Sequence, residues 1–341
     1  MLDGKTVLIT GGTGSFGKKF IKVVLEKYSP KKIIVYSRDE LKQYELQLIY
    51  PTSNYPIRYF IGDVRDLPRL KMAMNDVDIV VHAAALKQIP TIEYNPFEAV
   101  KTNVIGGQNV IDAALAANVS RVIALSTDKA CAPLNLYGAT KLTSDKLFIA
   151  ANNYKGKHDI RFSVVRYGNV MGSRGSVIPL MLSLRDAGVL TITDKRMTRF
   201  NITLQEGVDF VLNCLSTMNG RELFVPKLPS YHITDITTAI CPDCKIETMG
   251  IRPGEKIHEE MISIHDAMNT VDYGPYYVIY PEVAKMLDKA GNILNIGDLK
   301  GSLCDPGFSY NSGDNEDFLS VKQIRNLIEQ EPDDLAVVGR I

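Results

Sequence analysis

Residues 126–141, with the sequence STDKACAPLNLYGATK, hold the side chains of this chain that are best suited to acid–base chemistry. The segment from Tyr137 onwards is predicted to be a helix with Asn135 as its N-cap, so Tyr137 and Lys141 lie one turn apart on the same face. An ammonium beside a phenol lowers the phenol pKa below its usual value of about 10. We therefore expect Tyr137 to act as a general base towards a substrate hydroxyl.

An acidic and a basic residue, Asp128 and Lys129, precede that helix. They follow the apolar run Val122–Leu125, which is short enough to be a buried strand, and ligands bind at the carboxyl ends of strands in open α/β sheets. Lys129 could accept a proton if burial depresses the pKa of its ammonium, and Asp128 could donate one if it is neutral. The sequence leaves open which of the two is the acid and which is the base.

A glycine-rich loop near the N-terminus would position a nucleotide. The predicted strand Thr6–Thr10 runs directly into the sequence GGTGSFG, and a helix with regularly spaced apolar residues follows. Such glycines allow a tight turn, close approach of a pyrophosphate and close helix–strand packing, and the helix N-terminus faces the negative charge. The predicted ligands in this loop are Gly11, Thr13, Gly14, Ser15, Phe16 and Gly17.

The end of the second predicted strand, Ile33–Tyr36, favours NADP over NAD. A carboxylate at this position would bond the ribose 2′-hydroxyl, whereas a guanidinium accommodates a 2′-phosphate. Here Ser37 and Arg38 come first and Asp39 only afterwards. We expect Arg38 to bind the 2′-phosphate, with Lys42 assisting.

Two further strand ends complete the predicted cofactor site. A carboxylate after the strand Tyr59–Ile61 can accept a hydrogen bond from the adenine amino group. The run 79–85 is a fourth strand, and its small residues let the backbone approach the cofactor near its nicotinamide. His82 lies within this apolar strand and is predicted to be structural. The ligands expected from the two strand ends are Asp63, Val64, Ala83, Ala84 and Ala85.

The alternation of strands and helices over the first 166 residues predicts an α/β fold with a Rossmann-like, doubly wound parallel sheet. We expect residues 1–166 to bind the dinucleotide, with the chain returning to this domain near 200–226. Residues 167–341 would form a smaller C-terminal substrate-binding region. A helix near 321–328 is predicted to end the chain.

Several polar residues are predicted to bind the substrate. A guanidinium matches phosphate geometry, which makes two arginines candidates for a diphosphate. A helix is predicted to start near Thr203, and another to contain Glu259 and Glu260. Cys241 and Cys244 resemble half of a zinc site, but no second pair follows, so no metal is expected. The predicted substrate ligands are Lys87, Asn169, Arg199, Arg252 and Glu255.

Composition narrows the possible partners. Lys plus Arg and Asp plus Glu both number 39, giving a formal net charge of zero, which does not favour nucleic acid or an anionic membrane as the main partner. No apolar run is long enough to span a bilayer, and no signal peptide is recognised. Five scattered cysteines are typical of reduced thiols, so we expect a cytoplasmic protein.

Together these motifs resemble the extended short-chain dehydrogenase/reductase family over nearly the whole chain. The sequence STDKA at 126–130, with RPGEK at 252–256, is similar to the UDP-N-acetylglucosamine 4,6-dehydratases, and most to the inverting type that opens the pseudaminic acid pathway. The resemblance implies UDP-N-acetylglucosamine as substrate, tightly held NADP, and UDP contacts at Arg199 and Arg252. It also implies a homo-oligomer, expected to be a hexamer.

The resemblance implies a hydro-lyase reaction. Tyr137 would remove the C4 hydroxyl proton, Thr127 would hold the 4-oxygen, and Asp128 with Lys129 would remove water across C5 and C6. Three alternatives share parts of the site: a UDP-sugar 4-epimerase, a retaining or C5-epimerising dehydratase, and a non-enzymatic NADP sensor. An epimerase needs no Asp–Lys pair, and a sensor often lacks the Tyr–Lys pair.

Overall fold

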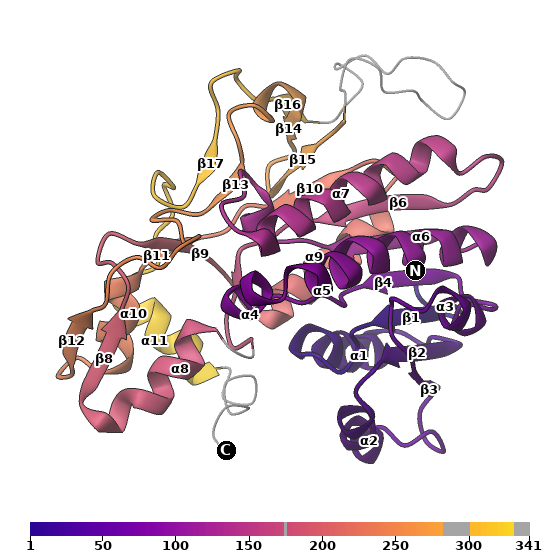
Figure 1. Cartoon of the computed structure of the whole chain (residues 1–341), viewed down its shortest axis with the longest axis horizontal. Coiled ribbons are helices and arrows are strands. Elements are labelled where there is room, and N and C mark those ends of the chain that lie inside the picture. The colour runs from indigo at the N-terminus through magenta and orange to yellow at the C-terminus, as the bar shows by residue number, and fades with distance from the viewer. Residues whose placement is uncertain (174–175, 282–300, 331–341) are drawn as a thin grey trace.

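A ten-stranded sheet forms the centre of the molecule (Figure 1). The computed structural model describes residues 1–173, 176–281 and 301–330. Seven neighbouring strands run parallel in the order β3-β2-β1-β4-β5-β6-β10, and their middle members are buried on both faces, which explains their continuous apolar sequences. The parallel strands are β1 (Thr6–Thr10), β2 (Lys32–Ser37), β3 (Ile57–Ile61), β4 (Ile79–His82), β5 (Arg121–Leu125), β6 (Arg161–Val165) and β10 (Leu223–Pro226).

Three antiparallel strands extend this sheet beyond β10. The sequence had placed them in the smaller C-terminal region, but β15 pairs with β10, and β14 and β16 follow outwards. They are too short to stand alone and gain their apolar contacts from the large sheet. Their bounds are Thr270–Asp272 for β14, Tyr276–Ile279 for β15 and Ser302–Leu303 for β16.

Helices cover the sheet in two groups, as a doubly wound fold requires: α1 packs beside α9, while α3, α6 and α7 lie in a row (Figure 1). These five span Ser15–Lys27, Leu204–Thr217, Leu67–Ala73, Gly106–Ala116 and Leu136–Tyr154. The predicted caps of two of them are confirmed, because Asn135 accepts from Gly138 N and Thr203 forms a capping box with Glu206. The remaining helices near the sheet are α2 (Glu40–Ile49), α4 (Ile89–Tyr94), α5 (Pro96–Ala99) and the 3-10 turns Asp128–Ala130 and Ala267–Asn269.

The start of α6 is irregular. A π-helical turn, Val100–Ile105, joins α5 to α6 without a break. The extra residue in this turn brings Asn103 to face the strand ends, where it is buried.

A smaller region packs around a second apolar cluster centred on Met181, Leu190 and Ile236 (lower left in Figure 1). The chain enters it through β7, which pairs with β9. Its helices are α8 (Val177–Leu184), the 3-10 turn Arg185–Ala187, α10 (Ile233–Ile240) and α11 (Val321–Gln330). Its short sheets contain β7 (Asn169–Val170), β9 (Thr198–Ile202) and β11 (Ser230–His232), and β8 (Val189–Ile192) and β12 (Lys245–Thr248). A further two-stranded sheet, β13 (Glu260–Ile262) and β17 (Tyr310–Asn311), packs its apolar residues into the core of the large sheet.

Three local predictions can be compared with this region. The helix near 321–328 is confirmed as α11. The helix predicted around Glu259 and Glu260 is wrong: Glu260 begins β13, and Ser312 holds the backbone of Glu259 through bonds to its N–H and its carbonyl. Cys241 and Cys244 form a disulfide, so the expectation of five reduced thiols is also wrong.

No helix in the described ranges has the length and apolar character that crossing a bilayer requires.

Candidate active site

Two adjoining cavities mark the site, at the carboxyl ends of the parallel strands. The larger, of about 530 Å³, crosses the point where the strand order reverses between β1 and β4, and the smaller, of about 260 Å³, continues it into the smaller region. Open α/β sheets bind ligands at such a reversal. All the predicted cofactor-binding and catalytic residues line the larger cavity, as do Lys87 and Asn169. Asn169 and Lys129 also line the smaller cavity, together with Arg199, Arg252 and Glu255.

The glycine loop has the shape that a pyrophosphate needs. Gly11 has a φ of +67°, and a Cβ there would lie 2.9 Å from Ala84 N; a Cβ at Gly17 would lie 2.5 Å from the backbone of Gly12. Gly14 is the N-cap of α1 and makes no side-chain cap, so the first N–H groups of the helix face the cavity. The residues present therefore fit a dinucleotide.

Cations border the adenosine end of the larger cavity. Arg38 is half exposed, and its Nη1 lies 3.7 Å from Asp63 Oδ2, while Arg65 holds the Asp63 carboxylate through Nε and Nη2 at 3.0 and 2.7 Å. The Asp39 carboxylate caps α2 and pairs with Lys42. Both acids are thus engaged by protein groups, and Arg38 is placed to meet a ligand.

Tyr137 and Lys141 lie on one face of α7, as expected, but their electrostatics differ from the expectation. Burial raises the pKa of Tyr137 to about 12, and the opposing influences are the Lys129 ammonium and a hydrogen bond with Thr127. Lys141 is buried and donates to Leu125 O at 2.7 Å, and burial lowers its own pKa. The cation that favours the Tyr137 phenolate is therefore Lys129 rather than Lys141.

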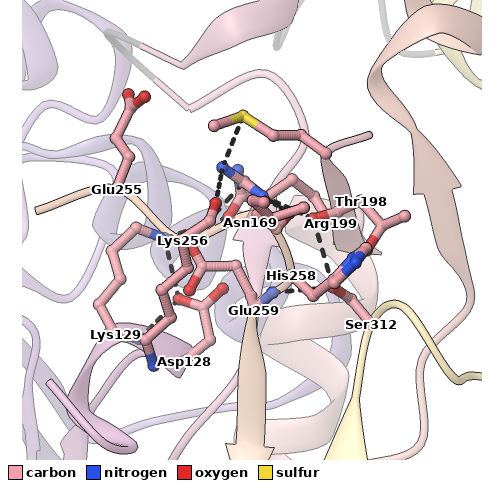
Figure 2. A network of polar contacts seen from close by, with 12 residues as sticks. Asp128, Lys129, Asn169, Thr198, Arg199, Glu255, Lys256, His258, Glu259 and Ser312 are labelled. Carbon is pink, nitrogen blue, oxygen red and sulfur yellow. Dashed lines mark hydrogen bonds and ion pairs between the residues drawn. The ribbon is translucent and has the colours of Figure 1, made fainter. Parts of the chain in front are cut away.

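The Asp128–Lys129 pair is part of a larger buried cluster (Figure 2). Asp128 Oδ1 accepts from Thr127 Oγ1, Lys129 N and Lys129 Nζ at 2.8, 2.9 and 3.0 Å. Lys129 Nζ also lies 3.4 Å from Glu259 Oε1 and 3.4 Å from Asn169 Oδ1. One ammonium is thus shared by two carboxylates that come from distant parts of the chain.

These carboxylates decide the charge of Lys129. Burial alone would lower the pKa of its ammonium, but Asp128 and Glu259 outweigh burial and raise it well above its usual value. The condition under which Lys129 would be the base, a depressed pKa, is therefore not met. In this structure Lys129 is an ammonium and can donate a proton.

The two arginines predicted to bind a diphosphate differ sharply. Arg199 Nη1 donates to the carbonyls of Thr198 and Ile257, its Nη2 donates to Lys256 O and contacts Met197, and its Nε lies 3.7 Å from Glu259. Its guanidinium is fully engaged by the protein. Arg252 is half exposed, and among the described residues its guanidinium pairs only with Glu255, with Nη1 and Oε1 4.0 Å apart.

The loop around Arg252 contacts the catalytic segment directly. Asn135 Nδ2 donates to Gly254 O at 2.9 Å, and Lys256 Nζ donates to Cys131 O at 2.7 Å. These bonds connect the smaller region to the segment between Lys129 and α7. They therefore fix the position of Arg252 relative to Asp128 and Lys129.

Sequence reasoning missed two buried residues of the site. Glu259 was assigned to a helix without a role, and Asn103 was given no role. Asn103 accepts from Leu86 N at 2.8 Å and donates to Leu86 O and Thr140 Oγ1 at 3.0 Å each, which ties the loop after β4 to α7. An amide within an apolar helix was the one available signal for Asn103.

Comparisons with known proteins agree with this geometry. Residues 7–281 match the model of a family described as polysaccharide biosynthesis protein. A curated relative from Campylobacter jejuni subsp. jejuni serotype O:23/36, strain 81-176, named UDP-N-acetylglucosamine 4,6-dehydratase (inverting), is 54% identical over 96% of this chain and 98% of its own length.

Solved structures share the fold. The structure of Pen from Bacillus thuringiensis is 36% identical, covers 97% of this chain and 99% of its own, and has a TM-score of 0.86. DesIV from Streptomyces venezuelae, a dTDP-glucose 4,6-dehydratase solved with NAD bound, is 21% identical, covers 74% of this chain and 86% of its own, and has a TM-score of 0.66. The family match, the curated relative and the Rossmann-like site together place this chain in the polysaccharide biosynthesis protein family, within the extended short-chain dehydrogenases/reductases.

Proposed function

We propose that this protein is an NADP-dependent UDP-N-acetylglucosamine 4,6-dehydratase, a hydro-lyase that inverts C5. The observation that carries the proposal is the buried Asp128–Lys129 pair next to Tyr137, at the junction of a nucleotide cavity and a second cavity bordered by Arg252. An epimerase would use the cofactor and Tyr137 but has no step that needs this pair. The name of the 54% identical Campylobacter relative supports the same reaction.

The roles of the residues follow from their charges. The cofactor, held by the glycine loop, would supply hydride exchange with C4 and C6 of the sugar. Tyr137 takes the C4 hydroxyl proton as a phenolate, the form that the Lys129 ammonium and Thr127 favour, and the resulting ketone acidifies the C5 proton. Asp128 accepts the C5 proton, and Lys129 donates a proton to the C6 hydroxyl, which leaves as water. The proton that Tyr137 took passes to Lys129 and restores its ammonium. Asp128 releases the proton that it accepted, and one proton returns to C5, so each protein group regains its starting protonation state.

Thr127 would support these steps. Thr127 contacts both Asp128 and Tyr137, so it is placed to hold the 4-oxygen between them. The assignment of Lys129 as acid and Asp128 as base is supported by the raised ammonium pKa, because that pKa keeps Lys129 protonated at neutral pH and so unsuited to accept a proton.

NADP is proposed over NAD because Arg38 and Lys42 are the cations at the end of β2, while Asp39 caps α2. UDP would meet Arg252 and Glu255 in the smaller cavity, near Asn169, and Lys87 would border the sugar. The pseudaminic acid pathway, a cytoplasmic location and assembly into a hexamer stay predictions from the family resemblance.

One NMR time course with UDP-N-acetylglucosamine and catalytic NADP tests the function. We expect loss of water, inversion at C5 and no lasting growth in the absorbance of the reduced cofactor. Stoichiometric accumulation of reduced cofactor would indicate a simple dehydrogenase. A product epimerised at C4 with its water retained would indicate an epimerase, and retention at C5 would indicate a retaining dehydratase.

A further inference from the structure

Glu259 is a buried carboxylate that the reaction outlined above does not yet use. Its side chain is 4% exposed, and its Oε1 contacts two cations, Lys129 Nζ at 3.4 Å and Arg199 Nε at 3.7 Å. Its Oε2 is buried and has no hydrogen-bond partner among the described residues. A carboxylate is placed in such an environment at a high desolvation cost, which the two cations offset.

The backbone around Glu259 is held firmly. Ser312 Oγ accepts from Glu259 N at 2.9 Å, and Ser312 N donates to Glu259 O at 2.8 Å. Thr198 on β9 exchanges a hydrogen bond of 2.8 Å with Ser312 Oγ and another of 2.8 Å with His258 Nδ1 (Figure 2). The carboxylate therefore has a fixed position relative to Arg199, which adjoins Thr198 on the same strand.

The charges around Lys129 come from several elements. Two carboxylates face its ammonium, Asp128 from its own 3-10 turn and Glu259 from the segment before β13. The cation Arg199 on β9 opposes them. The other titratable groups that interact with Lys129 are Lys87 after β4, Tyr137 on α7 and Tyr231 on β11.

We propose that Glu259 is a positioning residue for water loss: it holds Lys129 beside Asp128 as a charged proton donor. The inference rests on the proposed function and extends it to a third ionised residue. With Glu259 present, two carboxylates balance the two cations Lys129 and Arg199, and the ammonium keeps its proton at neutral and alkaline pH. Without its charge, Lys129 keeps one carboxylate and still faces Arg199, so it releases its proton at lower pH.

The test compares the wild type, Glu259→Gln and Glu259→Asp, each as the NADP-loaded enzyme with UDP-N-acetylglucosamine. Water loss is followed by NMR across neutral and alkaline pH, and C4 oxidation is followed in a single turnover by the reduced cofactor. We expect Glu259→Gln to oxidise C4 as the wild type does at neutral pH, where Lys129 keeps its proton, and to lose water more slowly as the pH rises and Lys129 releases it. We call the fall in the rate of water loss at high pH the alkaline limb. In Glu259→Gln this limb should begin at least about one pH unit lower than in the wild type. Above the new pKa of Lys129, the rate should fall about tenfold per pH unit.

The alkaline limb of Glu259→Asp should lie between those of the wild type and Glu259→Gln. Its carboxylate is still charged, but the side chain is one methylene shorter and so holds that charge further from Lys129. Glu260→Gln is the matched control, since it removes a charge one residue along the chain, and its limb should equal that of the wild type.

The outcomes separate this inference from the function on which it rests. No water loss in the wild type would reject the proposed function. An active wild type with an unchanged limb in Glu259→Gln, even at a uniformly reduced rate, would reject the positioning role alone. Should Glu259→Gln not fold, the limb of Glu259→Asp decides: a downward shift supports the role and an unchanged limb overturns it.

Discussion

The two ends of the cleft are built in opposite ways. At the nucleotide end, one continuous loop supplies backbone N–H groups and glycines, and its shape depends on the missing side chains of Gly11 and Gly17. At the sugar end, side chains do the binding, and the Lys129 cluster draws on residues as far apart in sequence as Asp128 and Glu259. The first kind of site is tolerant of side-chain changes outside its glycines, whereas the second depends on every charge in it, because an unpaired buried ion is costly.

The largest expected effect is at the acid–base pair. Removing a positioned acid or base costs typically about 10²–10⁴-fold in rate, so Asp128→Asn and Lys129→Ala should be nearly inactive in water loss. Both should still bind NADP and UDP, measured by titration calorimetry. In deuterated water, C5 exchange should persist in Lys129→Ala, although more slowly because the Tyr137 phenolate loses its neighbouring cation, and it should vanish in Asp128→Asn if Asp128 is the base. The reverse pattern would make Lys129 the base and Asp128 the acid. Full activity in both variants would favour the hypothesis that the protein is a UDP-sugar 4-epimerase.

Tyr137→Phe is the companion variant at this end. It should abolish C4 oxidation and therefore water loss as well, since the ketone is needed to acidify C5. Appearance of reduced cofactor in a single turnover checks this; a normal burst would show that another group takes the hydroxyl proton.

A pair of matched substitutions separates binding from support at the sugar end. Arg252→Ala should raise KM for the nucleotide sugar by about 10–100-fold, the value of one charge-assisted contact, with little change in stability. Arg199→Ala should instead lower the free energy of unfolding by about 2 kcal/mol or more, because its protein partners become unsatisfied. If the two variants changed KM and the free energy of unfolding by the same amounts, Arg252 and Arg199 would not differ in role as proposed.

A smaller effect is expected at the nucleotide end. Arg38→Asp should weaken NADP binding by about tenfold, as one exposed charged contact is lost, and should favour NAD. Fluorescence titration with both reduced cofactors measures the ratio. A wild type that already prefers NAD would show that Arg38 does not recognise a 2′-phosphate.

The effect that is smallest at neutral pH concerns the strand beneath the cleft. His82 is buried with its Nδ1 2.8 Å from Thr10 Oγ1, and burial lowers its pKa from 6.5 to about 3. The unfolded chain binds a proton on His82 more readily than the folded protein does. The contribution of neutral His82 to the free energy of unfolding is therefore fully present above pH 6.5, and it falls by about 1.4 kcal/mol per pH unit as the pH drops towards 3. In urea titrations, His82→Gln should lose less stability than the wild type over this window. Equal losses would show that His82 does not contribute.

The sequence predicted what is local. The glycine loop, the Tyr137–Lys141 face and the cap at Asn135 each depend on residues within one turn or loop, whose spacing is visible in the chain. The charge of Lys129 could not be predicted in this way. It depends on Glu259, 130 positions away, whose place is fixed by the pairing of Thr198 with Ser312, and nothing near Glu259 in the sequence indicates that contact.

The same reasoning explains the misplaced strands. The strands β14 to β16 are too short to show an alternation of apolar and polar residues. They join the large sheet because β15 pairs with the free edge of β10, and that edge exists only once the chain has come back to the large sheet to form β10. The fold class was therefore predictable from repeated local patterns, while the exact sheet edge was not.

The π-helical turn at Val100–Ile105 has a consequence for how this chain can change over evolutionary time. A π turn holds one residue more than an α turn, so deleting one residue would restore a regular helix and rotate one side of it by about 100° relative to the other. Asn103 would then turn away from Leu86 and Thr140, while every apolar residue of α6 could keep its place. The turn thus makes the helix sensitive to single-residue insertions and deletions as well as to substitution of Asn103.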